Sequence, residues 1–190
     1  MAVSVQNNIT YGLSNGKYAV ATNSTGTWSF GAVKDLPNLQ EFNSSVIGSK
    51  NNVYADNKVV ASPSSISGIE LTVKLSTLTD EFLKDVLGYV ADSKGNLCEV
   101  SNAEPKTFAL GFQLEGDKAA KRVWFFLCSA THPGEKSSTN TESITANDRE
   151  LSITVRPLTA GDYEVLKSTS KKGDTDYETF LNTCTIPTFG

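Results

Sequence analysis

Apolar and polar positions alternate most clearly over residues 69–75. Aliphatic residues occupy every second position there, and Glu70, Thr72 and Lys74 stand between them. This period of two predicts a strand with one buried face and one wet face. Residues 108–114 and 151–155 repeat the pattern. We therefore expect a sheet built from the centre and the later part of the chain.

A short amphipathic helix is predicted between the first two of these strands, at about Thr79–Leu87. Thr79 is expected as the N-cap, acidic residues follow it in the first turn, and Gly88 ends the helix. Asp80 and Lys84 stand one turn apart and are expected to form an ion pair. So short a helix is not stable alone in water, so it must pack against the sheet.

The first third of the chain predicts short strands and turns. Asn15-Gly16 is a strong turn signal between two short apolar segments, and residues 27–30 predict a further strand. From Leu39 to Ser65 the alternation is loose and the residues are mostly polar, which indicates a long loop. Within it, residues 53–61 predict a strand, a turn and a returning strand.

One later strand, Arg122 to Cys128, is apolar on both faces. Such a strand lies either between two layers or against another subunit. A turn at Glu115–Lys118 is expected to join it to the strand before it. Ser137–Thr145 is rich in Ser and Thr and indicates a loop. The chain becomes polar after Pro157, so we expect one β domain over residues 1–157, including an N-terminal arm, and a C-terminal arm or extension over 158–190.

Composition agrees with a globular, self-contained domain. The chain has 190 residues, of which 38% are hydrophobic and 20% charged, with a net charge of −4. No apolar run is long enough to span a bilayer, and the first residues do not form a secretory signal. We therefore expect synthesis in a cytoplasm and no association with a membrane.

The charges are unevenly distributed. Thr79 to Asp117 holds eight acidic and three basic residues. This block indicates a solvated face, or alternatively a surface that repels a polyanion. No segment is basic enough for tight binding to nucleic acid.

The candidate chemistry is sparse. The three cysteines, Cys98, Cys128 and Cys184, are widely spaced and include no Cys-x-x-Cys pair, which argues against a disulfide framework or a zinc site. Cys128 is expected to be a small buried hydrophobe. The single histidine, His132, precedes Pro133 and is expected in a turn, since no second metal ligand stands at a usable spacing.

Three acids of the predicted helix are the best remaining candidates for acid–base chemistry or magnesium binding. The helix cap and an ion pair explain Asp80, Glu81 and Asp85 fully, so the structural explanation is preferred to the chemical one. Gly-x-Ser-x-Gly and the common glycine-rich phosphate loops are missing. We therefore expect no catalytic residue, no cofactor and no metal, and the protein is not expected to be an enzyme.

Several short stretches, in this order and spacing, carry a resemblance to a known family. They are Tyr11–Leu13, Tyr54–Asn57, Gly68–Leu71, Asp80–Tyr89, Pro105–Leu110, Glu115–Lys118, Arg122–Cys128 and Thr141–Ile144. Together they span Tyr11 to Pro157, and the chain resembles the major tail proteins of those siphophages, phages with long non-contractile tails, that infect Gram-positive bacteria. It departs from that family at His132-Pro133, where Arg-Pro is commoner, and residues 158–190 show no resemblance.

The resemblance implies a mainly β fold, a β-sandwich or barrel-like tail-tube subunit with one short flanking helix and extended loop and terminal arms. It implies hexameric rings that stack into a tail tube around a tape-measure protein, with tail initiator and terminator proteins at its ends. DNA would be only a passing cargo in the lumen, which the acidic block could line. The protein would be part of the virion and assembled in the host cytoplasm. Leu39–Ser65, the N-terminal ten residues and the C-terminal arm are expected to contact neighbouring rings.

Two other functions are considered. One is the tube of a contractile tail or of a secretion-system-like particle, which would share the fold. The other is a β-sandwich module that binds a ligand or carbohydrate, which would need an exposed aromatic platform. Trp28 and Trp124 lie instead within apolar strand patterns.

Overall fold

The computed structural model of the protein describes residues 12–50, 53–55, 58–61, 64–116, 120–134 and 149–189, with side chains outside residues 49–64. The N-terminal ten residues, Ser137–Thr145, Thr141–Ile144 and part of the expected turn at Glu115–Lys118 lie outside this description. The described fold is mainly β with one short helix, which confirms the predicted fold class.

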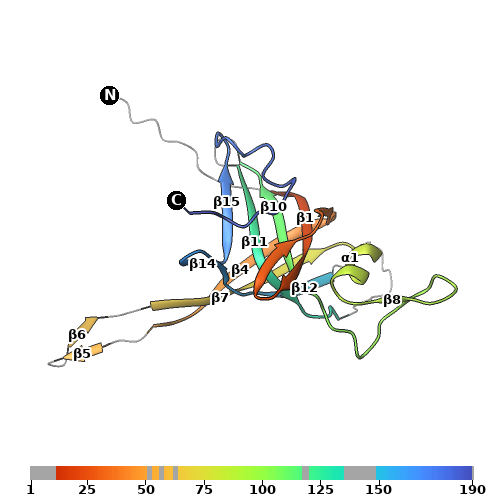
Figure 1. The fold of residues 1–190 in the computed structure, drawn as a ribbon, viewed down its shortest axis with the longest axis horizontal. Coiled ribbons are helices and arrows are strands. Elements are labelled where there is room, and N and C mark those ends of the chain that lie inside the picture. The colour runs from red at the N-terminus through yellow and green to blue at the C-terminus, as the bar shows by residue number, and fades with distance from the viewer. Residues whose placement is uncertain are drawn as a thin grey trace, which may run out of the picture.

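Nine strands form one antiparallel sheet (Figure 1). Its main path runs β2-β1-β10-β11-β12-β7-β4, with β3 paired to β1 and β15 paired to β11. Three hairpins, β5–β6, β8–β9 and β13–β14, stand outside it. The elements are β1 (Leu13–Ser24), β2 (Thr27–Phe30), β3 (Lys34–Asp35), β4 (Leu39–Lys50), β5 (Val53–Ala55), β6 (Lys58–Ala61), β7 (Ser64–Leu75), α1 (Asp80–Asp85), β8 (Val90–Ala91), β9 (Leu97–Cys98), β10 (Phe108–Leu114), β11 (Lys121–Ala130), β12 (Arg149–Val155), β13 (Leu158–Ala160), β14 (Tyr163–Val165) and β15 (Lys167–Lys171).

Strand β11 changes its neighbour halfway along one edge. Its first half, Lys121 to Phe125, pairs with β15, and its last residues, Cys128 to Ala130, pair with β12. The layer β12-β7-β4 therefore leaves the rest of the sheet at this point and curls over it. Phe42 of β4 reaches the ring of Phe112 in β10 at a centroid distance of 4.7 Å. This curl gives the sheet its barrel-like form.

The main core fills the inside of the curl. The alternating aliphatic residues of β7 and β12 meet aromatic residues of β10 and β11 there, as the period of two predicted. Helix α1 covers one end, where the ring of Phe82 lies edge-on to Tyr18 at 5.1 Å. The largest fully buried members of this core are Tyr18, Leu36, Leu71, Leu75, Phe82, Leu87, Phe108, Leu110, Phe112 and Leu151.

A second apolar cluster lies on the opposite face of β10 and β11. Residues Val123 to Cys128 of β11 are all buried, because their side chains are divided between the two clusters. They alternate from Val123 to Phe126, and Leu127 joins Phe126 in the second cluster where the pairing with β10 shifts register. Of the two explanations for a strand apolar on both faces, the described chain supports a place between two layers. The second cluster is formed by Ala21, Ala109, Trp124, Phe126, Leu127, Leu158 and Leu181, with Trp28, Phe30, Val33, Val165, Phe180, Cys184 and Ile186 packed against it.

Residues 158–189 supply much of the cover over this second face. Leu158 and Leu181 are buried in the second cluster, and the indole Nε1 of Trp124 donates to the carbonyl of Phe180 at 2.8 Å. The guanidinium of Arg122 stacks on Tyr177, with its Cζ 4.3 Å from the ring centre. The segment is therefore packed on the sheet and contributes buried apolar side chains to the second cluster. The division of the chain into a β domain over residues 1–157 and a C-terminal arm or extension over 158–190 stays a prediction.

The turn predicted at Asn15-Gly16 is wrong, because both residues lie inside strand β1. The pairing of β1 with β10 shifts register between Ser14 and Lys17, so the dipeptide forms a bulge and not a chain reversal. Asn15 has a φ of 51°, which asparagine tolerates. A Cβ on Gly16 would lie 2.2 Å from the carbonyl oxygen of Leu36, so only glycine fits this close approach.

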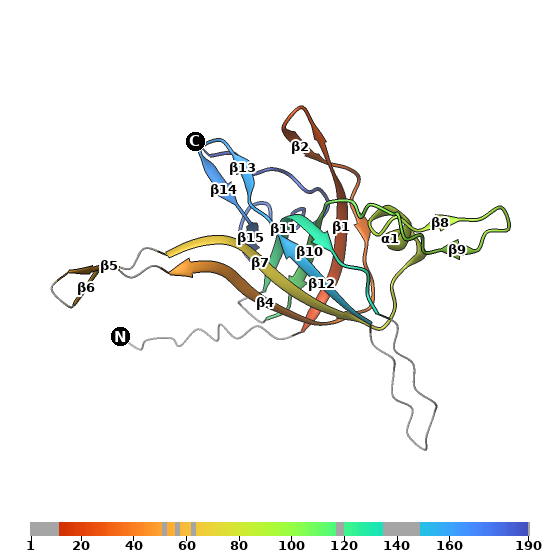
Figure 2. The ribbon, with the colours of Figure 1, turned by 90° about the horizontal axis from the view of Figure 1, so that it is seen from below.

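The segment Leu39–Ser65 is a long hairpin and not the predicted loop. β4 and β7 pair from Leu39 opposite Leu75 to Lys50 opposite Ser64, and β5 and β6 pair as the two strands predicted within this segment. The turn predicted between them lies at residues 56–57, outside the described residues. The hairpin leaves the body at one end of the molecule (Figures 1 and 2).

Helix α1 spans Asp80–Asp85 and is shorter than the predicted range of Thr79–Leu87. Its predicted N-cap is confirmed, since the hydroxyl of Thr79 accepts the backbone N–H of Phe82. Val86 is the C-cap, and Gly88 beyond it has a φ of 76°, as expected where the chain leaves a helix.

Candidate assembly surfaces

The helix acids take part in a local ion-pair network. The ammonium of Lys34 in β3 lies 2.8 Å from Glu81 and 2.6 Å from Asp85. The hydroxyl of the buried Tyr18 donates to Asp85 at 3.0 Å. The predicted ion pair between Asp80 and Lys84 is wrong, because no ion pair joins them in the described part of the chain.

The electrostatics of this network favour its charged form. Burial disfavours the Asp85 carboxylate, but the hydrogen bonds from Lys34 and Tyr18 outweigh this effect and lower its pKa. Hydrogen bonds to Asp85 and Glu81 raise the pKa of Lys34. Burial, and then the bond to Asp85, raise the pKa of Tyr18. The network therefore attaches α1 to the sheet and holds Asp85 ionised as a partner of Lys34.

His132 lies against the segment that carries β8 and β9. Its ring stacks on Tyr89 at a centroid distance of 5.8 Å, and its Nδ1 lies 2.9 Å from a carboxylate oxygen of Glu99, without the geometry of a hydrogen bond. Among the residues that the structure describes, no three or more His, Cys, Asp or Glu side chains are grouped as a metal site would require. These contacts connect the end of β11 to the β8–β9 segment.

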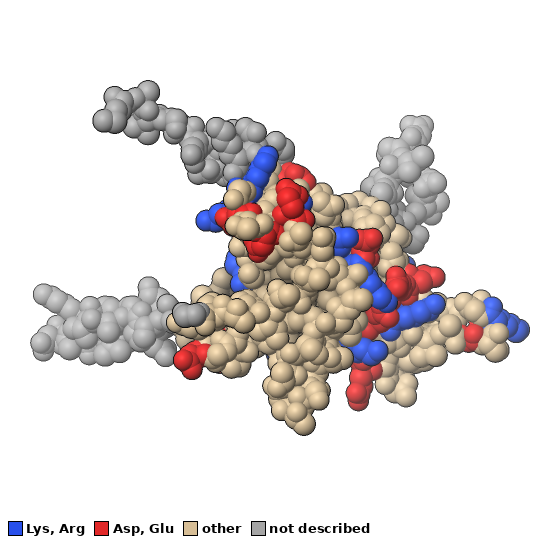
Figure 3. Space-filling view, turned by 45° about the horizontal axis from the view of Figure 1, so that its top comes forward, with Lys and Arg blue, Asp and Glu red and all other residues tan. Residues whose placement is uncertain are grey.

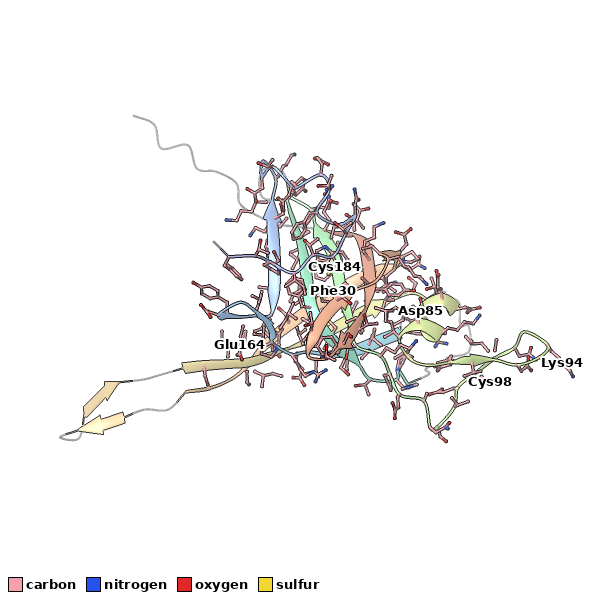
Figure 4. All side chains as sticks on the ribbon, viewed as in Figure 1. Phe30, Asp85, Lys94, Cys98, Glu164 and Cys184 are labelled. Atoms are coloured by element: carbon pink, nitrogen blue, oxygen red, sulfur yellow. The ribbon has the colours of Figure 1, made fainter. Side chains whose placement is uncertain are left out.

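All three cysteines are free thiols in different environments. Cys128 is buried as predicted, and its burial raises the pKa of the thiol. Cys184, labelled in Figure 4, packs against the second cluster, and burial raises its pKa to about 12. Cys98 is exposed at the end of β9. Among the described residues, no disulfide joins any two of the three.

Neither tryptophan forms an exposed platform. Trp124 is 2% exposed, and Trp28 is half-buried against the second cluster. A binding module that stacks sugars on exposed indole rings therefore has no support from these two residues.

The outer face of the layer β12-β7-β4 is polar over its whole width. The side chains that face away from the core form three rows across the layer. Each row contains one residue from each of the three strands, and these residues are partners in register. In the first row the ammonium of Lys74 lies 2.6 Å from Glu41. The sequence alternation placed Glu70, Thr72 and Lys74 on this wet face but not the partners beside them. The rows are Glu150–Lys74–Glu41, Ser152–Thr72–Asn43 and Thr154–Glu70–Ser45.

Strand β4 is an outer edge of the sheet, because β7 is its only strand partner among the described residues. From Gln40 to Ser49 its one charged residue is Glu41, which already pairs with Lys74. β15 is a second outer edge, and it begins and ends with lysine, a common protection against unwanted strand pairing. At the other end of the main path, β2 is also uncharged, but it is only four residues long. β4 lacks this protection over ten residues, so it is a long edge open to another strand.

The acidic block at Thr79–Asp117 does not form one face. Its described acids are spread over α1, the β8–β9 hairpin and the end of β10, and several have local partners. The side-chain amide of Asn96 and then the backbone N–H groups of Asn96 and Lys94 donate to Asp92, and these bonds lower its pKa. Figure 3 likewise shows acidic and basic side chains intermixed on the visible face.

A comparison of the sequence with known protein families identifies one family. The model of the family described as phage tail tube protein matches residues 38–182, from the start of β4 through the C-terminal cover. No curated protein matches the chain. In the described residues there is no helix with the length and apolar character to cross a membrane. The family consists of structural proteins of the virion tail and is not an enzyme family. The predicted resemblance to a major tail protein is confirmed, and the chain belongs to the phage tail tube protein family.

Proposed function

We propose that six copies of this protein close into a ring and that the rings stack into the tube through which phage DNA leaves. The observation that carries the proposal is the open edge of β4 beside the polar face of β12-β7-β4. An exposed strand of this length is an aggregation hazard in a monomer, and a neighbouring subunit removes the hazard by pairing with it. Head-to-tail association of this kind closes into a ring when its rotation permits.

The polar face is the proposed lining of the lumen. It holds Glu41, Glu70 and Glu150 against one lysine, and its other side chains are hydroxyls and one amide. Carboxylates repel phosphate groups, and hydroxyls offer no charge to retain them, so DNA would slide past such a surface. This assignment replaces the acidic block at Thr79–Asp117, which is spread over several elements.

The projecting β4–β7 hairpin is the proposed contact between stacked rings. It extends beyond the body at one end of the molecule, as an element that reaches a neighbour must (Figure 2). The N-terminal ten residues and the C-terminal segment are proposed to assist it. The other proposed partners are the tape-measure protein inside the tube and the tail initiator and terminator proteins at its ends. Assembly takes place in the host cytoplasm and needs no membrane.

Electron microscopy of the purified protein tests the proposal. We expect six-fold rings or tubes at high concentration, either alone or after addition of tape-measure and initiator proteins. A protein that stays monomeric under all of these conditions would contradict it. Rings of another symmetry would contradict the hexamer alone.

A contractile-tail tube or a secretion-system-like particle would share the ring and its lumen. Purification of the intact particle separates these assemblies from the proposed one. A bare tube supports the non-contractile tail, and a tube enclosed in a second protein layer supports the contractile type.

A further inference from the structure

Six large apolar side chains are exposed among the described residues, and they lie on three parts of the fold. Val46, Ile47 and Ile66 lie on the β4–β7 hairpin, and Val46 and Ile66 are 62% and 59% exposed. Tyr163 and Phe189, on β14 and near the C-terminus, have ring centres 4.5 Å apart. Val90, on β8, is the sixth such residue.

We call five of these residues the apolar corner: Val46, Ile47, Ile66, Tyr163 and Phe189. Ile69, the partner of Val46 in register, is buried, so the exposed residues begin where the hairpin leaves the core. β14 lies beside this part of the hairpin in both ribbon views (Figures 1 and 2). Glu164 lies at the same place, between the body and the hairpin (Figure 4).

The sixth residue belongs to the β8–β9 hairpin at the opposite end of the molecule. Val90 pairs in register with Cys98, and both are exposed. The turn between the strands is preformed, because Asp92 accepts the N–H groups of Lys94 and Asn96, each at 2.8 Å. Lys94 is therefore presented at the tip, far from Glu164 (Figure 4).

We propose that the β8–β9 hairpin of one copy docks in the apolar corner of the next copy. Val90 would pack against the apolar side chains, and Lys94 would pair with Glu164. This inference rests on the proposed tube function and names the surfaces that one of its contacts uses.

Two observations favour a second copy as the occupant. The charges are complementary, since Asp162 and Glu164 are exposed at the corner and Lys94 is exposed at the hairpin tip, where Asp92 is already engaged by the turn. The two surfaces also lie at opposite ends of one chain. Each copy can therefore donate one surface and accept at the other, which is the arrangement of head-to-tail assembly.

Exchange of the two charges tests the pairing. Lys94→Glu and Glu164→Lys should each raise the concentration needed for assembly about tenfold, because like charges then meet at the contact, and the double variant should recover most of this loss. Lys171→Glu, which reverses an exposed charge at the end of β15, is the control.

Cross-linking tests the position. A variant that carries Cys98→Ser and Ile66→Cys is assembled together with the unmodified chain. A short bismaleimide should then join the native Cys98 of an unmodified copy to the cysteine at position 66 of a variant copy. Ser152→Cys, on the polar face, replaces Ile66→Cys in the control. Tubes that form normally with either single charge variant, or that give no more cross-link than the control, would overturn the docking and leave the tube function intact. Failure of the unmodified chain to assemble under any condition would overturn both.

Discussion

The ring of Trp124 lies directly against the backbone of Gly111, its partner in register on the neighbouring strand. A Cβ on Gly111 would come within 2.7 Å of the Trp124 ring. The indole Nε1 is at the same time held by the carbonyl of Phe180. A single glycine thus sets the depth at which the C-terminal segment can pack on the sheet.

Gly111→Ala should therefore destabilise the protein. The added methyl displaces the indole ring, and overpacking of this kind costs about 1–3 kcal/mol. Urea unfolding followed by tryptophan fluorescence measures the loss. Gly134→Ala is the matched control, because a Cβ there meets nothing within 4 Å. Equal stability of the two variants would contradict the close contact.

Arg122 should hold the C-terminal segment in place. Besides stacking on Tyr177, it donates to the carbonyl of that residue and to Gln113. Arg122→Ala should cost about 2 kcal/mol and speed proteolysis after Lys171 or Lys172. Limited trypsin digestion with mass spectrometry measures this. Arg156→Ala is the control, since Arg156 is exposed and has a longer contact of 3.4 Å with Thr107. Similar digestion of both variants would argue against this role.

The Asp85 network should make stability depend on pH. Because the folded protein lowers the pKa of Asp85, the carboxylate contributes stability above its unfolded pKa, and this contribution is lost as the pH falls through the folded value. Asp85→Asn should cost about 1 kcal/mol at pH 7. The difference from the unmodified protein should narrow below a pH of about 4. Thermal unfolding of both proteins from about pH 3 to about pH 8, a range that includes the ordinary pKa of aspartate, measures this difference in stability. The exposed Glu104→Gln, which has no such partner among the described residues, should show no comparable difference.

The three thiols should react at very different rates. Cys98 is exposed and should be labelled first by a thiol reagent at neutral pH. Cys184 should follow far more slowly, since a pKa of about 12 leaves almost no thiolate. Cys128 should react only after unfolding, because it is buried. Mass spectrometry of a labelling time course separates the three, and early modification of Cys128 would contradict its place in the core.

Positive charge on the polar face should slow the passage of DNA. Ser45→Lys and Thr154→Lys would add cations to one row of that face, where phosphate would be retained. Tubes should still form, and infectivity should fall about tenfold. Thr169→Lys, on the exposed surface of β15, is the control. Unchanged infectivity in both variants would argue that this face does not line the lumen.

The strands of the core could be predicted because each has one buried and one wet face. The period of two over residues 69–75 is the direct result of this environment, and the cap at Thr79 depends only on neighbouring residues. The outer half of β4 could not be predicted in this way. It extends beyond the core, so no buried face imposes an alternation, and its polar residues resemble those of a loop.

The errors at Asn15-Gly16 and at Asp80–Lys84 have another cause. Both predictions used local signals, and distant residues decided both results. The backbone of Leu36 approaches Gly16, and Lys34, 51 residues before Asp85 in the chain, takes the helix carboxylates. For the same reason the sequence predicted only the β7 residues of the polar face. Their partners lie on β12 and β4, which are separated from β7 in the sequence or not recognisable there as strands.

The divided edge of β11 has a mechanical consequence. Force applied to the projecting hairpin passes from β4 and β7 into β12 along seven paired residues. It then reaches β11 through only three, while β15 is joined to another part of the same strand. The seam between β11 and β12 is the shortest strand pairing along the main path of the sheet, and it is therefore the most compliant joint on that path. Bending of a tail built from such subunits would be absorbed there, and the packing around Trp124 would stay undisturbed.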